Sequence, residues 1–393
     1  MIRNCNFELR NYEKFNRLAG IYIHIPFCRT ACDYCNFHFS TSLKRKGELV
    51  KAMQQELALR KDYLNAEQID SIYFGGGSPS VLDVSEIQAI LQDINLHYDV
   101  IDNAEISLEA NPDDLSLEKL SGLREIGVNR LSIGIQSFLE EELKTLGRIH
   151  SAKQAITSIE NARKTGFSSL TIDLIYGIQN SSLDSWQENL DIMKSLQLNH
   201  FSSYALTVEP KTVLAHKIKK GAKKEIDEEL LREQYFMLKK FAKANSFNHY
   251  EISNFSKEGF YSIHNTNYWK HKKYVGIGPS AHSFDLKSRR WNMAVNADYI
   301  SKIRSGEQFW DEEQLSRQDQ FNEKLMLGLR TMWGVDLEEL FKVFNATNKH
   351  QFLNRIEYYE QMEFIKREDS IIRFTDEGIL FSDQIISDLF IEE

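Results

Sequence analysis

Between about residues 20 and 205, the sequence alternates short β-rich runs with longer amphipathic stretches. This alternation is the strongest constraint on the fold, because it is the pattern that builds parallel sheets with crossover helices. Successive β-rich runs begin roughly 30 to 40 residues apart, which is the length of one βα unit. The pattern predicts six strands, over residues 20–25, 71–74, 104–109, 130–135, 168–174 and 201–204.

The stretches between these runs have the periodicity of helices, over residues 44–63, 84–96, 117–126, 152–164 and 183–196. We therefore predict an α/β fold with a partial (β/α)6 barrel, although periodicity alone does not exclude an open sheet. In a barrel the carboxyl ends of the strands converge on one face, where sites are assembled. Four predicted strands end in residues suited to a site, namely Gly75 to Gly77, Glu109, Gln136 and Asp173. They predict one common site.

The predicted organisation is an N-terminal extension (1–19), the barrel core (20–205), a segment that completes the barrel and carries a histidine motif (206–305), and a C-terminal module (306–393). The lysine-rich stretch 217–224 is interpreted as a solvated helix face. Segment 264–283 is rich in aromatic residues, His, Asn and Gly, and is predicted to be an ordered loop rather than a helix. The helix-rich end of the chain, with two β-like pieces at 364–365 and 371–374, predicts a smaller helical, winged-helix-like module.

Charge and hydropathy limit the classes of partner. The chain has 48 Lys and Arg against 57 Asp and Glu, a formal net charge of −9, so it has no general attraction for nucleic acid or anionic membranes. No apolar run approaches the roughly 18 to 20 residues that cross a bilayer, and the first residues lack the layout of a signal peptide. A cytoplasmic location is predicted.

Three of the four cysteines, Cys28, Cys32 and Cys35, lie within eight positions directly after the first predicted strand. They are too close together and odd in number for a disulfide framework, so a metal is the better interpretation, and Cys5 is taken as an isolated thiol. An iron–sulfur cube normally takes four cysteines, and three would leave one iron open to a small molecule. A zinc site of Cys3His type, with His38 or His24 as the fourth ligand, is the alternative.

The segment 22–37, YIHIPFCRTACDYCNF, resembles the opening motif of radical SAM proteins, in the branch that holds oxygen-independent coproporphyrinogen III dehydrogenase and the haem chaperone HemW. The resemblance extends over nearly the whole chain. It recurs at YFGGGSPS (73–80), EANP (109–112), GVNRLSIGIQSF (127–138) and DLIYG (173–177).

The resemblance implies that Cys28, Cys32 and Cys35 hold a [4Fe–4S] cluster whose open iron chelates S-adenosylmethionine. It also implies eight contacts to that ligand, from Tyr22, Gly76, Gly77, Ser78, Glu109, Gln136, Arg148 and Asp173. Acidic acceptors suit the cationic amino and sulfonium groups, and Arg148 suits the carboxylate. Taken singly, the glycines could form only a tight turn, Glu109 or Asp173 could cap a helix, and Arg148 could form a surface ion pair. Ser78 departs from the family, which usually has threonine there.

Two features favour the chaperone side of the branch. Phe37 stands where the dehydrogenase has a fourth cysteine, and only 27 residues precede Cys28, whereas the dehydrogenase has a longer N-terminal segment. The sequence HNTNYW at 264–269 matches the H-N-x-x-Y-W motif associated with haem binding in HemW-like proteins. His264 is thus the predicted axial ligand of haem, beside the flat apolar faces of Tyr268 and Trp269. His249, His271 and His282 are competitors or second ligands.

We therefore predict a haem chaperone that transfers haem to haem-requiring proteins such as respiratory enzymes, with peripheral contact at a membrane. The alternatives are the radical decarboxylation of coproporphyrinogen III and a zinc-dependent barrel hydrolase. The same binding residues serve a catalytic and a regulatory role of S-adenosylmethionine, so its cleavage stays open. Leu18-Ala19-Gly20 matches the Met-Ala-Gly with which HemW-like chains usually begin, so residues 1–17 are either an extension or the product of a misassigned start, with Leu18 as the initiator.

Overall fold

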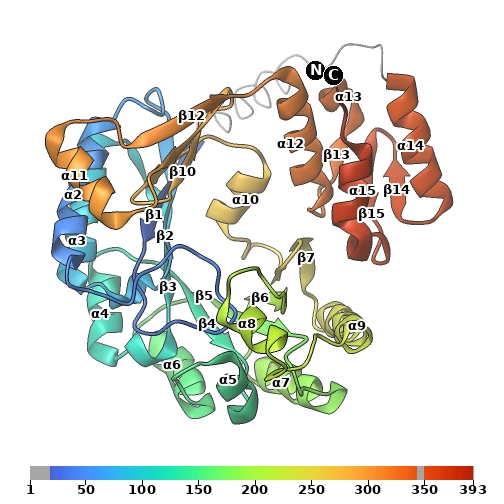
Figure 1. Ribbon diagram of the computed structural model, residues 1–393, viewed down its shortest axis with the longest axis horizontal. Coiled ribbons are helices and arrows are strands. Elements are labelled where there is room, and N and C mark those ends of the chain that lie inside the picture. The colour runs from blue at the N-terminus through green and yellow to red at the C-terminus, as the bar shows by residue number, and fades with distance from the viewer. Residues whose placement is uncertain (1–17, 343–348, 393) are drawn as a thin grey trace, which may run out of the picture.

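Six parallel strands lie side by side in chain order and form the centre of a curved sheet (Figure 1). The computed structural model describes residues 18–342 and 349–392, so the predictions about Cys5 and about residues 1–17 lie outside the described residues. The predicted α/β partial barrel is confirmed. The six strands are β1 (Leu18–Ile25), β2 (Gln68–Gly76), β3 (Val100–Ala110), β4 (Arg130–Gln136), β5 (Ser169–Tyr176) and β6 (His200–Ala205).

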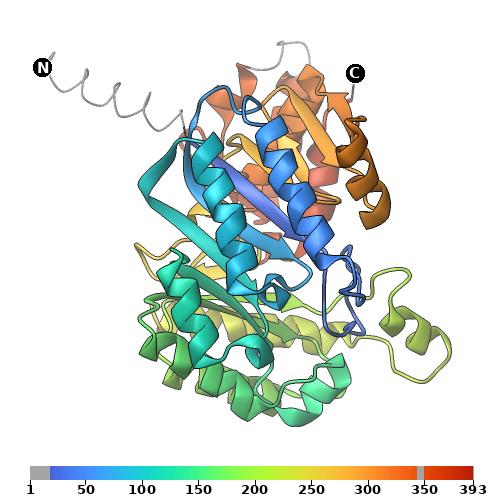
Figure 2. The same ribbon diagram turned by 90° about the vertical axis from the view of Figure 1, so that its left-hand side faces the viewer.

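Helices cover the convex face of this sheet, as Figures 1 and 2 show. Ser and Asp residues begin several of them, because a side-chain oxygen at the N-cap accepts a hydrogen bond from a free backbone N–H. Ser116, Ser151 and Ser182 do so for three of the helices. The covering helices are α2 (Lys46–Leu59), α3 (Val84–His97), α4 (Leu117–Glu125), α5 (Glu140–Leu146), α6 (Ala152–Lys164) and α7 (Leu183–Ser195).

The segment predicted to complete the barrel (206–305), together with the strand just beyond it, lengthens the sheet at both edges, to twelve strands. At one edge β9 (Tyr274–Ile277) pairs in parallel with β1, followed by the antiparallel strands β10 (His282–Phe284), β11 (Ser288–Asn292) and β12 (Trp310–Gln314). At the other edge β8 (Asn254–Ser256) and then β7 (Asn248–Glu251) continue from β6. The helices of this part of the chain are α8 (Val213–Lys219), α9 (Glu228–Ala244) and α11 (Asn296–Ser305).

The prediction of a loop at the histidine motif is wrong, because the chain forms helix α10 (Ile263–Trp269) there. Ser262 caps this helix by accepting a hydrogen bond from the backbone N–H of Asn265. The helix packs against β1 and β2 on the concave side of the sheet, where Figure 1 shows it apart from the outer helices. The cap and these tertiary contacts outweigh the weak helix propensity of a segment rich in His, Asn and aromatic residues.

The C-terminal module has its own hydrophobic core around Phe321, Phe352 and Ile372. Because β12 belongs to the large sheet, this core begins with α12 and not at the predicted boundary of 306. The arrangement of helices beside a small sheet agrees with the predicted winged-helix-like module. Its elements are α12 (Arg317–Leu329), β13 (Val335–Asp336), α13 (Leu337–Phe341), α14 (Lys349–Gln361), β14 (Ile365–Glu368), β15 (Ile371–Phe374) and α15 (Ser382–Leu389).

Strand alternation separates an apolar outer face from a polar inner face. Residues such as Ile21, Ile23 and Phe74 point into the core beneath the helices, while their neighbours in sequence face the concave side. Within the described residues, no helix is long and apolar enough to cross a membrane. The inner face carries Gly20, Tyr22 and His24 from β1, Ser71 and Tyr73 from β2, Glu105 and Glu109 from β3, Arg130 and Ser132 from β4, Asp173 from β5 and Tyr204 from β6.

Candidate functional site

Two cavities open on the concave side of the sheet. One, of about 480 Å³, is lined by Cys28, Cys32 and Cys35, and we call it the cysteine cavity. The other, of about 700 Å³, is lined by His24, His264 and His282 among others, and we call it the histidine cavity. Glu109 and Tyr204 line both, so the two cavities share a wall.

The cysteine loop leaves the end of β1 and is fixed at several points. The backbone N–H of Cys28 donates to the carbonyl of Ser40 at 3.1 Å, which closes the loop at its base. At its far side the carbonyl of Asp33 accepts from the N–H of Leu214 at 2.7 Å. The Asp33 carboxylate accepts from Lys217 Nζ at 2.6 Å and from Lys223 Nζ at 3.1 Å. Two lysines of the lysine-rich stretch therefore hold the cysteine loop, besides the role of the stretch as a solvated helix face.

The structure brings most of the predicted site into one place. The cysteine cavity is lined by the three cysteines together with Gly76, Gly77, Ser78, Glu109, Gln136, Arg148 and Asp173. Tyr22 is the exception, because it lines the histidine cavity and its hydroxyl bonds to His24 Nδ1 at 3.1 Å. The convergence follows from the parallel strands, whose carboxyl ends all lie at this edge.

Arg148 is built into the cavity and is not the surface ion pair that was the alternative. Its Nη1 donates to Cys32 Sγ at 3.3 Å, and its Nη2 donates to Asn111 Oδ1 at 2.7 Å and to the carbonyl of Gly134 at 2.8 Å. Asn111 in turn donates to Ser78 Oγ at 2.8 Å, and Ser78 Oγ donates to Cys28 Sγ at 3.6 Å. A hydrogen-bonded chain thus joins two of the sulfurs.

Two carboxyl groups give the cysteine cavity its acidic character. Burial raises the pKa of Glu109 to about 7, and the hydrogen bonds from Tyr73 Oη at 2.8 Å and from the N–H of Gly76 at 3.2 Å only partly offset this rise. Burial also raises the pKa of Asp173, to about 6. A cationic ligand between them would favour the charged form of both groups. The cavity therefore suits a ligand with positive charge.

Gly76 and Gly77 are required by the chain itself. Gly76 has a φ of 109°, and a Cβ there would lie 2.7 Å from the His24 ring. A Cβ on Gly77 would lie 2.6 Å from the carbonyl oxygen of Phe27, next to the first cysteine. The close packing of Gly77 on Phe27 holds the glycine turn against the cysteine loop. It is a second reason for glycine here, besides the predicted approach of a ligand to backbone without side chains.

The donor set of the cysteine cavity fits an iron–sulfur cluster with an open iron. Three sulfurs come from one loop, and burial raises the pKa of the Cys28 thiol to about 11, so binding of a metal would displace its proton. The two histidines of the zinc alternative make other contacts. His38 Nε2 bonds to Asn296 Oδ1 at 3.0 Å, and His24 lines the other cavity.

His264 stands in the wall of the histidine cavity with its ring orientation fixed. Its Nδ1 bonds to Ser71 Oγ at 3.0 Å, and its ring stacks on Tyr73 at a centroid distance of 5.0 Å. Among the described residues, none forms a hydrogen bond with Nε2. Burial lowers the pKa of His264 to about 4, so the imidazole is neutral at physiological pH, which is the form that binds a metal. An imidazole held through one nitrogen with the other free is the usual arrangement of a metal ligand.

The competing histidines differ in what surrounds them. His249 bonds through both nitrogens, to Lys239 Nζ at 2.9 Å and to the carbonyl of Ile252 at 3.1 Å, and it lies outside the cavity. His271 pairs with Glu323 at 3.3 Å. His282 lines the histidine cavity, and so it is the one of these three that the structure brings together with His264.

Several residues of the two cavities were not predicted from the sequence. Tyr73 joins the cavities, because its ring contacts His264 and its hydroxyl donates to Glu109. Tyr204 lines both cavities and Asn111 holds Arg148. Tyr73 could have been found from its position, since it lies two residues before Gly75 and so shares a strand face with the glycine turn.

Comparison with known proteins agrees with this geometry. The radical SAM superfamily model matches residues 22–193, and the HemN C-terminal domain model matches residues 315–381. The heme chaperone HemW of Bacillus subtilis is 33% identical over 94% of this chain and 98% of its own length. That of Lactococcus lactis is 31% identical over 95% of this chain and 97% of its own.

A solved structure shows the same fold over nearly the full length. Coproporphyrinogen III oxidase (HemN) from Escherichia coli, described as a radical SAM enzyme, superimposes with a TM-score of 0.82. The match covers 95% of this chain and 90% of that one at 21% sequence identity. With three cysteines and a ligand cavity at the strand ends, and with relatives above 30% identity over nearly their whole length, the chain belongs to the HemW family of radical SAM proteins.

Proposed function

We propose that this protein is a haem chaperone, which binds haem in the histidine cavity through His264 and passes it to haem-requiring proteins. The observation that carries the proposal is the position of His264, which lines a cavity of about 700 Å³ and is fixed through Nδ1, while none of the described residues forms a hydrogen bond with Nε2. The relatives named heme chaperone HemW support it. Lys272 and Arg289 also line this cavity, where Lys272 lies 3.7 Å from Asp70 and Arg289 pairs with Glu323 at 2.6 Å.

In this proposal the cysteine cavity holds the resident cofactors. Cys28, Cys32 and Cys35 bind a [4Fe–4S] cluster, which when loaded supplies an open iron site and one-electron chemistry. Glu109 and Asp173 would bind the cationic groups of S-adenosylmethionine, and Gln136, Ser78 and the backbone of Gly76 and Gly77, which line the same cavity, would bind the rest of it. Arg148 holds Cys32 through one guanidinium nitrogen and offers charge to the ligand carboxylate. Tyr22, which lines the histidine cavity beside Glu109 of the shared wall, is kept in this proposal as a contact of S-adenosylmethionine.

Haem titration of the anaerobically reconstituted protein tests the proposal. His264→Ala should weaken haem binding about tenfold or more and shift the Soret band, because an axial ligand is lost. His350→Ala, an exposed histidine of α14, is the matched control and should bind haem as the wild type does. Unchanged affinity and spectrum in His264→Ala would show that another residue is the ligand. Cys28→Ser should abolish the cluster and its absorbance while His264 still binds haem.

The same preparation separates the two alternatives. Phe37, 69% exposed beside the cysteines, stands in place of a fourth cysteine and speaks against the decarboxylase. Release of carbon dioxide from coproporphyrinogen III at a catalytic rate would replace the chaperone assignment. Zinc without iron or sulfide in anaerobically purified protein would remove the cluster from the proposal.

We further propose that the acceptors include membrane-bound respiratory enzymes, reached by peripheral contact. The haem-loaded protein should lose its Soret absorbance to membranes that contain an acceptor in its haem-free form. Membranes in which the acceptor is already loaded are the control. Equal loss of haem to both would indicate passive partition into lipid and would refute directed transfer.

A further inference from the structure

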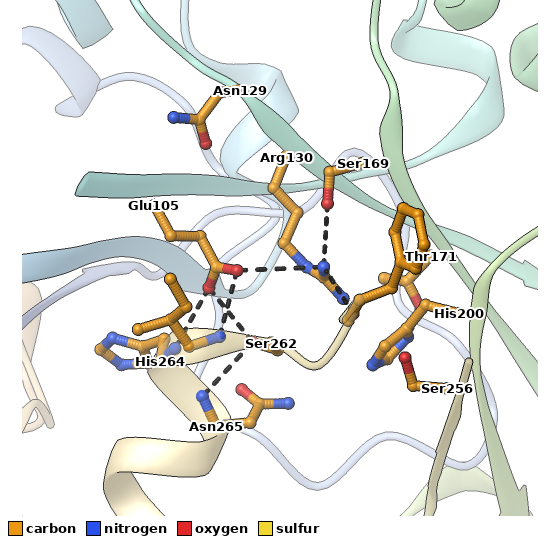
Figure 3. Close-up of polar contacts among 12 residues, drawn as sticks. Glu105, Asn129, Arg130, Ser169, Thr171, His200, Ser256, Ser262, His264 and Asn265 are labelled. Atoms are coloured by element: carbon orange, nitrogen blue, oxygen red, sulfur yellow. Dashed lines mark hydrogen bonds and ion pairs between the residues drawn. The ribbon is translucent and has the colours of Figure 1, made fainter. Parts of the chain in front are cut away.

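Glu105 of β3 is a buried carboxylate that takes no part in the proposed binding of haem or S-adenosylmethionine. Its Oε1 accepts from Ser262 Oγ at 3.2 Å and from the backbone N–H of His264 at 3.1 Å, and its Oε2 accepts from the N–H of Ile263 at 3.1 Å (Figure 3). All three donors lie at the start of α10. One side chain of the barrel therefore holds the first turn of the helix that carries His264.

Arg130 on the neighbouring strand β4 completes the arrangement. Its Nη1 lies 3.9 Å from Glu105 Oε2 and donates to Ser169 Oγ at 2.9 Å and to the carbonyl of Phe260 at 3.5 Å, as Figure 3 shows in part. Glu105 is 8% exposed and Arg130 is 4% exposed. A carboxylate at that depth needs a charge partner, and Arg130 provides it while also holding the chain just before α10.

The helix needs this external support. It has seven residues, and a helix of two turns is not stable alone because too few hydrogen bonds repay the cost of starting it. The backbone of His264 is held by Glu105 and its ring by Ser71, so both ends of the residue are fixed to neighbouring strands. A shift of the helix start would move the imidazole away from Ser71 and change the direction of Nε2.

We propose that Glu105, supported by Arg130, is a positioning residue for haem binding, which sets the place and orientation of the His264 imidazole. The inference rests on the proposed function, since it takes His264 as the ligand. It goes beyond the proposed function by assigning a role to two residues that line neither cavity. Loss of a residue that served stability alone would lower haem binding, cluster content and S-adenosylmethionine binding together. Loss of a positioning residue lowers haem binding and leaves the other two unchanged.

Variants of Glu105 test the proposal in the full-length, cluster-loaded protein. Glu105→Ala should weaken haem binding about tenfold or more and shift the Soret band, with cluster content and S-adenosylmethionine affinity unchanged. Glu105→Gln keeps the volume and one acceptor oxygen and should lie between Glu105→Ala and the wild type. Glu142→Ala is the matched control, because Glu142 is also buried and accepts three hydrogen bonds, from Ser137, Asn189 and Ser185, but lies in α5.

The outcomes separate this inference from the function on which it rests. If His264→Ala loses haem and Glu105→Ala does not, the positioning role is overturned and the chaperone proposal stands. If His264→Ala binds haem normally, the ligand assignment fails and the positioning role fails with it. If Glu142→Ala loses as much haem affinity as Glu105→Ala, general destabilisation is the cause and the proposal is overturned. Should Glu105→Ala not fold, the haem affinity and Soret band of Glu105→Gln decide.

Discussion

Substitution of Glu109 by Gln should make the ligand-free protein more stable at alkaline pH while it weakens ligand binding. Glu109 lies in the wall between the cavities, and burial raises its pKa from 4.5 to about 7. One pKa unit corresponds to about 1.4 kcal/mol, so ionised Glu109 costs the folded protein up to about 3 kcal/mol relative to the unfolded chain. Because solvent partly reaches the side chain, we expect a net effect of about 2 kcal/mol.

The sign of the pH dependence follows from the raised pKa. The folded protein holds the Glu109 proton to higher pH than the unfolded chain does, so the wild-type free energy of unfolding falls as the pH rises from about 4.5 through about 7. Gln cannot ionise and escapes this loss. At pH 8 the ligand-free Glu109→Gln variant should therefore be the more stable protein, and at pH 4.5 the advantage should vanish.

Urea unfolding of the ligand-free proteins at pH 5 and pH 8 measures this difference. Glu160→Gln, which removes an exposed carboxylate, is the charge-matched control and should show no such change between the two pH values. The Glu109→Gln variant, reconstituted with its cluster, should bind S-adenosylmethionine about tenfold or more weakly, because a charged hydrogen-bonding group is lost. A Glu109→Gln variant that is equally destabilised at both pH values, or that binds the ligand normally, would refute this account.

Three further predictions concern the shared wall and the glycine turn. Gly77→Ala should cost about 1–3 kcal/mol and lower cluster incorporation, since its Cβ would meet the carbonyl of Phe27. Urea unfolding measures this cost, with Gly47→Ala, in open space on α2, as the control that should stabilise by about 0.5–1 kcal/mol. Tyr73→Phe should weaken S-adenosylmethionine binding severalfold and keep haem affinity. The variant loses the hydrogen bond to Glu109 but retains the ring against His264. Equal effects on both affinities, measured by titration, would contradict this. Wild-type affinity for S-adenosylmethionine should fall as the pH is lowered through about 7, where Glu109 takes up a proton, and a flat calorimetric profile between pH 5.5 and 8 would argue against a carboxylate contact.

Much of the architecture was predictable because the information is local. The six parallel strands follow from alternating runs of β-branched residues and amphipathic stretches. The cysteine cavity follows from one topological rule, that the carboxyl ends of parallel strands meet at one edge. Residues as distant as Cys28 and Asp173 could therefore be assigned to the same cavity before their positions were known.

The failures have a different physical origin. Helix α10 is held in part by Glu105, 158 positions before Ile263, and no local propensity can contain such a contact. Tyr22 lines the histidine cavity near Glu109 of the shared wall, and its predicted contact with S-adenosylmethionine stays a prediction. Arg148 was predicted from the resemblance alone, and its hydrogen bonds to Cys32 and Asn111, which no local pattern contains, are what hold it in the cysteine cavity.

The wall shared by the cysteine and histidine cavities, formed in part by Glu109 and Tyr204, has a consequence for protein engineering. Replacing either side chain by a smaller one, to admit a bulkier tetrapyrrole, would also remove part of the lining of the cysteine cavity. It would open a passage there for water and oxidants. A change of tetrapyrrole preference should therefore begin at residues that line the histidine cavity alone, such as Trp269.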